Sequence, residues 1–349
     1  MRNIRDEGYR VIAVAPRDNS TDSIIKEGFG FRELKYLKRK GSNPLSDLKL
    51  YLEIKKIIKE LGPKFIFSYT IKPVIYTNLA SIKKSTSIST ITGLGYTFLN
   101  NNLTSKIARK LYKIALTKCD HIYFQNIDDR ELFEKSKIIK QDKARIINGS
   151  GIDTDKFKPL ENRKENSFFT FLFIGRLLKD KGIYELLEAS SRLIEIDSGV
   201  KLKIIGPFDE DNPSSISKEN FEMHTNSKNI EYLGYMNNVI HEIQKADCVV
   251  LPSYREGIPR VLLEAISVEK PIIATNVPGC RQVVDDGVNG YLVEVKSHED
   301  LFLKMKMMIE FTEETRREMG KKGRKKAREV FDIKLINNHY LELMRNCDN

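Results

Sequence analysis

Short apolar runs and longer amphipathic segments follow one another along the whole chain. A short apolar run between turn residues predicts a buried strand, and apolar residues recurring every three to four positions predict a helix. In the first half, strands are expected at 10–15, 64–69, 87–92, 121–125 and 144–147, and helices at 45–61, 74–82, 104–118 and 128–135. Such alternation is typical of a parallel sheet with helices on both faces.

The second half repeats this alternation after a turn-rich, charged segment at 149–166, which we interpret as a hinge. Strands are expected at 168–175, 201–206, 230–234, 247–251, 271–275 and 290–293. Helices are expected to begin near Gly182, Ser214, Asn237, Pro259 and Gln282, and the chain from 297 onward is expected to be helical. Because 349 residues exceed one ordinary core, the pattern predicts two α/β domains.

Charge is distributed unevenly between the two halves. The net charge is +11, and residues 1–160 carry 31 Lys and Arg against 17 Asp and Glu. The first half is therefore a candidate for contact with an anionic surface. The four cysteines show no paired spacing, which argues against a disulfide framework or a zinc site and favours a reducing cytoplasm. No apolar run has the length of a membrane span.

One strand-loop-helix segment, 251–264, carries a carboxylate in its loop and another in its helix. Gly257 allows close approach of the backbone, and Pro259 suits the first helical turn. The start of a helix favours an anion such as phosphate, with Glu256 and Glu264 placed to accept hydroxyl groups on either side. The alternative is that Glu264 only pairs with Arg260 at i,i+4 while Glu256 is a solvated loop residue.

A second candidate anion site follows the apolar run 168–174. Gly175 ends this run, and Arg176 and Lys181 come directly after it. Ligands of open α/β sheets bind at the carboxyl ends of strands, where cations can neutralise a leaving phosphate. The alternative is an ordinary basic loop. Two such sites in one domain favour a diphosphate.

Other motifs remain open from the residues alone. Gly93 and Gly95 match two glycines of a dinucleotide fingerprint, but the third position is Phe98, so this dehydrogenase signal is weak. The helix at 104–118 carries Ile107, Leu111, Ile114 and Ala115 on one face among basic residues. Such a helix either lies on an anionic bilayer or packs its apolar stripe on its own sheet. The five histidines show no metal or triad spacing.

Three blocks in order resemble retaining glycosyltransferases of family 4. They are G-R-L-L-K-D-K-G at 175–182, E-G-I-P-R-V-L-L-E at 256–264 and V-P-G-C-R-Q-V-V-D-D-G-V-N-G at 277–290. The resemblance implies a GT-B fold, in which two Rossmann-like domains face each other across a cleft. It also implies an acceptor domain at 1–158, a donor domain at 159–330, and a C-terminal helix at 331–349 that packs back on the acceptor domain.

The resemblance also assigns roles to residues. Arg176 and Lys181 would bind the donor diphosphate, Glu256 would face the donor sugar, and Glu264 would accept the ribose hydroxyls. The donor-binding set is Gly175, Arg176, Lys181, Glu256, Gly257, Ile258, Pro259 and Glu264, of which Glu256, Arg176 and Lys181 are the catalytic candidates. No metal or other cofactor is expected, and the leaving phosphate would act as base without a protein nucleophile.

In the first half, S-Y-T-I-K-P-V-I-Y-T-N at 68–78 and T-G-L-G-Y-T-F-L at 92–99 resemble bacterial enzymes that extend lipid-linked glycans. This implies transfer from a UDP-sugar, such as a GalNAc or related hexose donor, to a polyprenyl-diphosphate-linked saccharide in surface polysaccharide synthesis. The acceptor-side candidates are Thr92, Gly93, Leu94, Gly95 and Lys72. The enzyme would lie in the cytoplasm, bound peripherally to the inner face of the membrane through its basic first domain. No nucleic-acid partner is expected.

Two further expectations concern the chain start and other functions. Residues 5–9 are expected to end a helix at Gly8, whereas the family begins with a strand, a loop and a helix before this point, about 20 to 30 residues. The first domain is thus expected to lack that unit. The alternatives to transfer are a nucleotide-sugar epimerase of the same fold and a nucleotide-sugar-binding protein without turnover.

Overall fold

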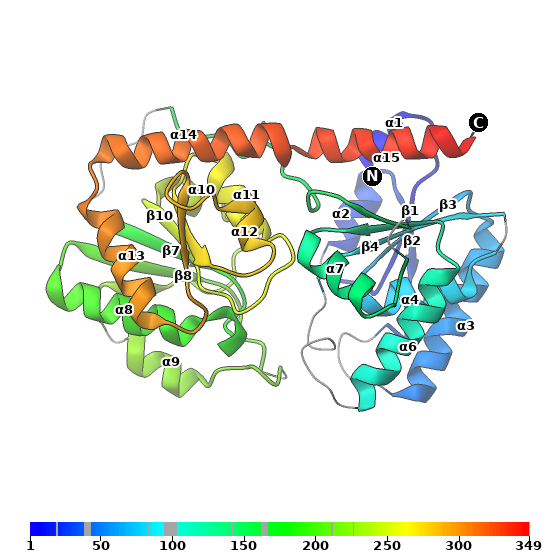
Figure 1. The fold of residues 1–349 in the computed structure, drawn as a ribbon, viewed down its shortest axis with the longest axis horizontal. Helices are drawn as coiled ribbons and strands as arrows, with labels where there is room; N and C mark the ends of the chain where they lie inside the picture. Colours follow the sequence, from blue (N-terminus) through cyan, green and yellow to red (C-terminus); the bar gives the residue numbers. More distant parts are fainter. Residues whose placement is uncertain are drawn as a thin grey trace. The chain divides into compact units, whose positions relative to one another are not determined.

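The computed structural model describes residues 1–18, 20–37, 43–82, 84–93, 103–140, 143–161, 167–210, 212–225 and 227–348. Its contacts divide the chain into two compact units. The first unit comprises Met1–Ile147 together with Asn337–Asn349, and the second comprises Asn148–Ile336. Each unit has the alternating parallel α/β architecture that the sequence pattern predicts, and each is drawn in Figure 1.

The described part of the first unit contains two parallel sheets. Strands β1 (Ile12–Ala15) and β2 (Gly30–Glu33) form one, and β3 (Phe65–Tyr69), β4 (Thr86–Ile91), β5 (His121–Phe124) and β6 (Ala144–Ile146) form the other in that order. The helices are α1 (Arg2–Asp6), α2 (Thr21–Lys26), α3 (Pro44–Leu61), α4 (Ile71–Ala80), α6 (Leu103–Thr117) and α7 (Ile127–Lys135). Central β4 is buried along almost its whole length, whereas β1 and β3 leave Val14 and Tyr69 exposed.

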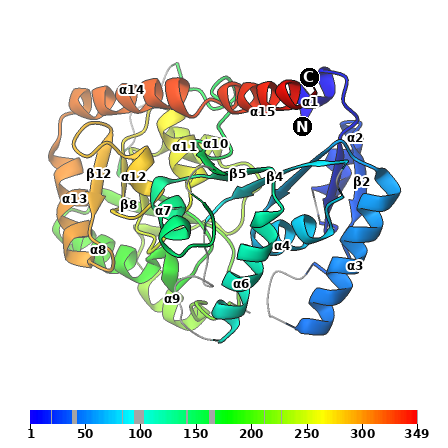
Figure 2. The same ribbon diagram turned by 45° about the vertical axis from the view of Figure 1, so that its right-hand side comes forward.

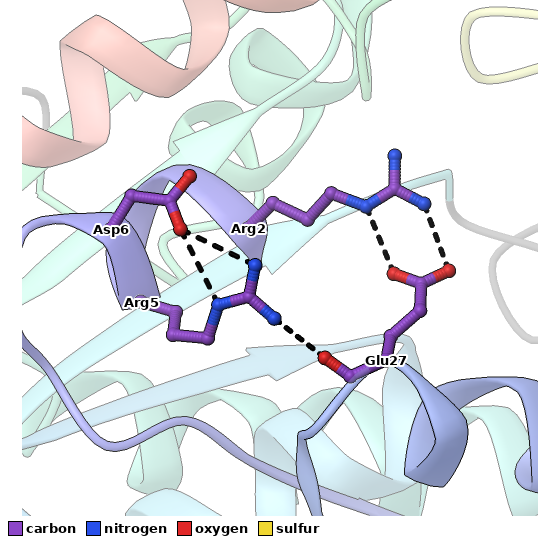
Figure 3. Close-up of polar contacts among 4 residues, drawn as sticks. All are labelled: Arg2, Arg5, Asp6 and Glu27. Carbon is purple, nitrogen blue, oxygen red and sulfur yellow. Dashed lines mark hydrogen bonds and ion pairs between the residues drawn. The ribbon is translucent and has the colours of Figure 1, made fainter.

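Two elements of this unit, α2 and β2, were not expected from the sequence. They are short, and β2 reads G-F-R-E, with one large apolar side chain and two charged ones. Figure 3 shows how α1 joins α2: the Arg2 guanidinium donates two hydrogen bonds, of 2.9 and 2.8 Å, to the Glu27 carboxylate. Arg5 donates to the Glu27 carbonyl at 2.5 Å and lies beside Asp6. These contacts are exposed, so they orient α1 more than they stabilise it.

The helix α1 ends as the sequence indicates. Gly8 has φ of +88°, in the left-handed region that glycine adopts without strain, and its N–H donates to the Arg5 carbonyl.

The last helix, α15 (Ile333–Asp348), contributes its residues from Asn337 onward to the first unit. Tyr340 contacts three strands of this unit: its ring packs edge-on against Phe67 and Tyr123, and its hydroxyl lies 3.0 Å from Thr90 Oγ1. One aromatic side chain thus ties the C-terminal helix to β3, β4 and β5.

In its described residues, the second unit has one six-stranded parallel sheet. Its strands are β7 (Phe169–Ile174), β8 (Val200–Ile205), β9 (Ile230–Tyr232), β10 (Cys248–Leu251), β11 (Ile272–Thr275) and β12 (Gly290–Val293), in the order β12-β11-β10-β7-β8-β9. The helices are α8 (Ile183–Ile196), α9 (Lys218–Thr225), α10 (Ile240–Lys245), α11 (Arg260–Ser267), α12 (Cys280–Val283), α13 (His298–Glu310) and α14 (Glu313–Val330). Helix α8 packs against α13, and α11 packs against α14 (Figure 2).

The order of strands creates a switch point between β7 and β10. From β7 the chain winds outward to β8 and β9, then returns to β10 and winds the other way to β11 and β12. In open parallel sheets, the loops at the carboxyl ends of the two central strands separate at such a point and leave room for a ligand. The loops after β7 and β10 are the two segments that the sequence singles out.

Candidate active site

The loop after β7 is held against the loop after β10 by a glycine contact. Gly175 follows β7 directly, and the 3₁₀ turn η2 (Lys179–Lys181) ends at Gly182, whose φ is +69°. A Cβ at Gly182 would lie 2.1 Å from the Pro252 carbonyl oxygen. Only glycine therefore fits here, and the fit brings Lys181 to the residues that follow β10.

Lys181 and Glu256 form an ion pair between these two loops. Their side chains are 21% and 14% exposed, so both charges are partly removed from water. Low solvent access increases the attraction between the two charges but also costs free energy of desolvation, and removing one partner leaves the other charge uncompensated. The cation and the carboxylate that the sequence places at two strand ends are thus adjacent in the fold.

Residues at the carboxyl end of a third strand, β11, also hold the loop 252–259 in place. Gly279, which follows β11, packs so closely that a Cβ there would lie 1.1 Å from the Gly257 carbonyl oxygen. Thr275 Oγ1 also donates a hydrogen bond to the Ser253 carbonyl. A Cβ at Gly149 would meet the Ile258 side chain at 3.2 Å. The backbone that leads into α11 is therefore held rigidly.

Helix α11 begins one residue later than the sequence indicates. Pro259 is the N-cap, with extended backbone angles, and Arg260 is the first helical residue. Pro259 and its neighbours Gly257 and Ile258 lead directly into the exposed N–H groups of the first turn. This is the arrangement that favours an anion, because the N–H groups and the helix dipole both point at it.

Glu264 lies one turn into α11 and is 8% exposed. Arg260 Nε donates to Glu264 Oε1 at 2.8 Å, so the i,i+4 contact considered as the alternative does form. Burial raises the pKa of the Glu264 carboxyl, and the Arg260 charge partly opposes that rise. Because the Arg260 side chain is 67% exposed, the pair does not explain why the carboxylate is buried.

Arg176 has a partner that the sequence did not assign to it. Its guanidinium lies 2.7 Å from an Asp209 carboxylate oxygen, in the acidic loop that follows β8. A general signal was available, because consecutive strands of a parallel α/β sheet are often neighbours and the loops after neighbouring parallel strands share one sheet edge. Arg176 is half exposed, so an incoming anion can compete with Asp209 for it.

A second contact that the sequence did not predict lies at the same edge of the sheet. Tyr254, two residues before Glu256, donates a 2.6 Å hydrogen bond to Glu185 in α8. Burial and the nearby Glu185 charge raise the pKa of the Tyr254 hydroxyl above its usual range. Nothing in the spacing of Tyr254 and Glu185 predicts this contact, because it depends on how α8 packs on the sheet.

The acceptor-side candidates belong to the first unit. Lys72, in α4, pairs with Asp47 of α3 at 2.9 Å. Thr92 and Gly93 follow β4, the neighbour of the strand that precedes Lys72, so the three lie at the same sheet edge. Leu94 and Gly95 lie outside the described residues. Thr70, just before α4, has a φ of +66°, which is strained for a threonine.

The residues present define the chemistry that this edge of the second unit supports. Two cations in the loop after β7 and the start of α11 after β10 can hold a diphosphate, and two carboxylates flank it. Among the described residues, no group of three or more His, Cys, Asp or Glu side chains is arranged to hold a metal ion. In the same part of the chain, no helix is both long and apolar enough to cross a bilayer.

Comparison with protein families places the chain in a known class. Residues 153–326 match the family described as glycosyl transferases group 1, and residues 1–126 match the family described as glycosyl transferase 4-like. The chain therefore belongs to the group 1 glycosyltransferases, and it is an enzyme of sugar transfer.

Individual relatives are more specific. The chain is 28% identical, over 98% of its own length and 93% of the relative, to N,N'-diacetylbacillosaminyl-diphospho-undecaprenol alpha-1,3-N-acetylgalactosaminyltransferase of Campylobacter jejuni. It is 27% identical to UDP-Gal:alpha-D-GlcNAc-diphosphoundecaprenol alpha-1,3-galactosyltransferase of Escherichia coli, over 72% of this chain and 67% of that one.

Among solved structures, HepE of Anabaena in complex with UDP matches with a TM-score of 0.78 at 16% identity, over 97% of this chain and 93% of that one. This likeness confirms the GT-B fold that the sequence predicts.

Proposed function

We propose that this chain transfers a sugar from a UDP-sugar to a polyprenyl-diphosphate-linked saccharide during the synthesis of a surface glycan. The observation that carries the donor half is the meeting of Lys181, Glu256 and the start of α11 at the carboxyl ends of β7 and β10. The acceptor half rests on the relatives, since both are named for diphospho-undecaprenol-linked sugars.

Each side chain has a role that its surroundings support. Lys181 and Arg176 would neutralise the charge that develops on the departing diphosphate. Glu264, buried beside the helix start, would accept the ribose hydroxyls. Glu256 would lie against the donor sugar and would give up part of its contact with Lys181 when the diphosphate binds. The N–H groups after Gly257 would bind phosphate oxygens.

The proposed reaction retains the anomeric configuration. A departing phosphate oxygen would take the proton of the acceptor hydroxyl while the hydroxyl attacks from the same face of the sugar. This course needs no protein nucleophile, and the proposal includes no metal ion. Since the acceptor is carried by a lipid, the enzyme would work peripherally at the inner face of the membrane. The donor would be a GalNAc or related hexose derivative.

The direct test is to incubate the protein with labelled UDP-sugars and a polyprenyl-diphosphate-linked saccharide. Label is expected to move to the lipid-linked product, with the new bond in the donor's anomeric configuration by NMR. Epimerised nucleotide sugar in reactions without acceptor would instead indicate an epimerase. Binding of donor without any product, where the Campylobacter relative is active on its own substrate, would contradict transfer.

Replacing Glu264 distinguishes a role in binding the ribose hydroxyls from a role only in the ion pair with Arg260. We expect Glu264→Gln to weaken UDP binding at least about tenfold, because the neutral amide cannot accept two hydroxyls as strongly as the carboxylate. Arg260→Gln, which removes only the helix-surface partner, should change the affinity less than about threefold. Isothermal titration of UDP measures both. Equal, small effects of the two variants would mean that Glu264 serves only its ion pair.

A further inference from the structure

Three neighbouring helices of the first unit leave an apolar groove open to solvent. Helix α4 lies between α3 and α6, in contact with both (Figure 2). The groove has a volume of about 500 Å³. Leu48 and Tyr51 line it from α3, Leu79 from α4, and Ile107 and Leu111 from α6. Its two walls belong to one compact unit, so their residues form a single surface.

Apolar side chains continue outward from the groove along both helices. Leu45, Leu48 and Leu52 follow one another along one face of α3 and are 72%, 54% and 54% exposed. Ile107 and Ile114 do the same on α6 at 52% and 44%. The expected single stripe of α6 is therefore divided. Ala115 is buried and Leu111 half-buried, as expected of an inward face, whereas Ile107 and Ile114 face outward.

Lysines surround these outward apolar side chains. On α6 the exposed residues near Ile107 and Ile114 are Lys106, Lys110 and Lys113, and the helix has no acidic residue. On α3, Lys49, Lys55 and Lys56 are exposed on either side of the leucines. Of the three acidic residues of α3, Asp47 pairs with Lys72, Glu60 pairs with Lys56, and Glu53 accepts the backbone N–H groups of residues 35 and 36. We call the exposed leucines, isoleucines and lysines of α3 and α6 the α3–α6 surface.

We propose that the α3–α6 surface docks on an anionic lipid bilayer, with the leucines and isoleucines entering the headgroup region and the lysines binding lipid phosphates. The mixture of protruding aliphatic side chains and lysines is what interfacial helices carry, and each lysine near an anionic bilayer adds to the attraction. A nucleic acid would be matched by the cations but not by the five aliphatic side chains. The inference rests on the proposed function, because it supplies the surface by which the enzyme reaches a lipid-linked acceptor.

Flotation with vesicles tests the surface without any sugar transfer. The wild-type protein is expected to float with vesicles of phosphatidylglycerol and phosphatidylcholine, and at least about tenfold less with phosphatidylcholine alone. A triple change of Lys106, Lys110 and Lys113 to Gln is expected to lower binding to the anionic vesicles at least about tenfold. A triple change of Leu45, Leu48 and Leu52 to Ser should lower it by a similar factor.

The second unit offers matched control variants. Exposed lysines of α14 serve for charge, with Lys321, Lys322 and Lys325 changed to Gln. Exposed aliphatic residues serve for apolar contact, with Ile196, Leu303 and Leu335 changed to Ser. Both controls are expected to keep wild-type flotation. Equal losses in surface and control variants, or wild-type protein that stays unbound, would overturn the proposal. Self-association in place of flotation would also overturn it and would assign the surface to a second copy.

Activity on a water-soluble, short-chain diphosphate-linked acceptor separates this inference from the proposed function. The surface variants should keep wild-type kcat on that acceptor and lose rate only on the long-chain acceptor in vesicles. If the protein transfers sugar but never floats with vesicles, the docking proposal is wrong and the proposed function stands. Vesicle binding with the expected lysine dependence, but without transfer to either acceptor, would support the docking surface and contradict the proposed function.

Discussion

Changing Lys181 to methionine is expected to lower kcat for sugar transfer by about 100-fold, because the departing diphosphate loses a cation at the point where its charge grows. The methionine retains the length of the lysine stem. The loss should exceed that of an ordinary contact for a second reason. Glu256, only 14% exposed in its side chain, would be left without its partner and would repel the anion.

Lys179→Met is the matched control, since Lys179 lies in the same 3₁₀ turn but is exposed. Steady-state kinetics with saturating donor should give a kcat within about twofold of wild type for this control. The interpretation of Lys181 fails if both variants have the same kcat, or if Lys181→Met changes only KM. In the latter case Lys181 would bind donor and transition state equally well.

The second large effect concerns the backbone that holds the donor loop. In Gly279→Ala the new methyl group would overlap the Gly257 carbonyl oxygen, so the segments after β10 and β11 must move apart. Since the Glu256–Pro259 loop sets the position of the helix start, we expect UDP affinity to fall by at least about tenfold and kcat/KM by about 100-fold. The thermal unfolding midpoint should fall as well, because overpacked sites cost about 1–3 kcal/mol.

Gly287→Ala provides the comparison. Gly287 also has a positive φ, of +72°, but no atom lies within 4 Å of the point that a methyl group there would occupy. This variant therefore carries the backbone strain, about 1–2 kcal/mol, without the overlap. If the two variants show equal loss of UDP affinity after correction for folded protein, the Gly279 contact does not position the donor loop.

The sequence predicts the second unit more fully than the first. Its central strands are almost wholly apolar, F-T-F-L-F-I in β7 and C-V-V-L in β10, and buried strands of this kind are recognised from composition alone. The first unit is harder because α2 and β2 are short and mostly polar. Its helix α6 also exposes two isoleucines of an apolar stripe for which the sequence leaves two partners open, its own sheet or a bilayer, and only packing decides which face of a broad apolar stripe is covered.

The candidate site was predicted in its residues but not in its contacts. Glu256, Lys181 and Arg176 were identified from their places after expected strands, and the strand order brings Lys181 to Glu256. The partners Asp209 and Glu185 were not assigned, because loop conformation and helix packing bring them in. The close approach of Gly279 to Gly257 is equally invisible in a single sequence, where each is one glycine among 20.

The central claim is that a nucleoside diphosphate binds where the loop after β7 meets the start of α11. Isothermal titration of UDP into the wild-type protein, Lys181→Met and Lys179→Met tests it most directly. The account predicts saturable binding to the wild type and to Lys179→Met, with affinity at least about tenfold lower for Lys181→Met, since one charge-assisted contact is lost. Saturable UDP binding of equal affinity in all three proteins would contradict it.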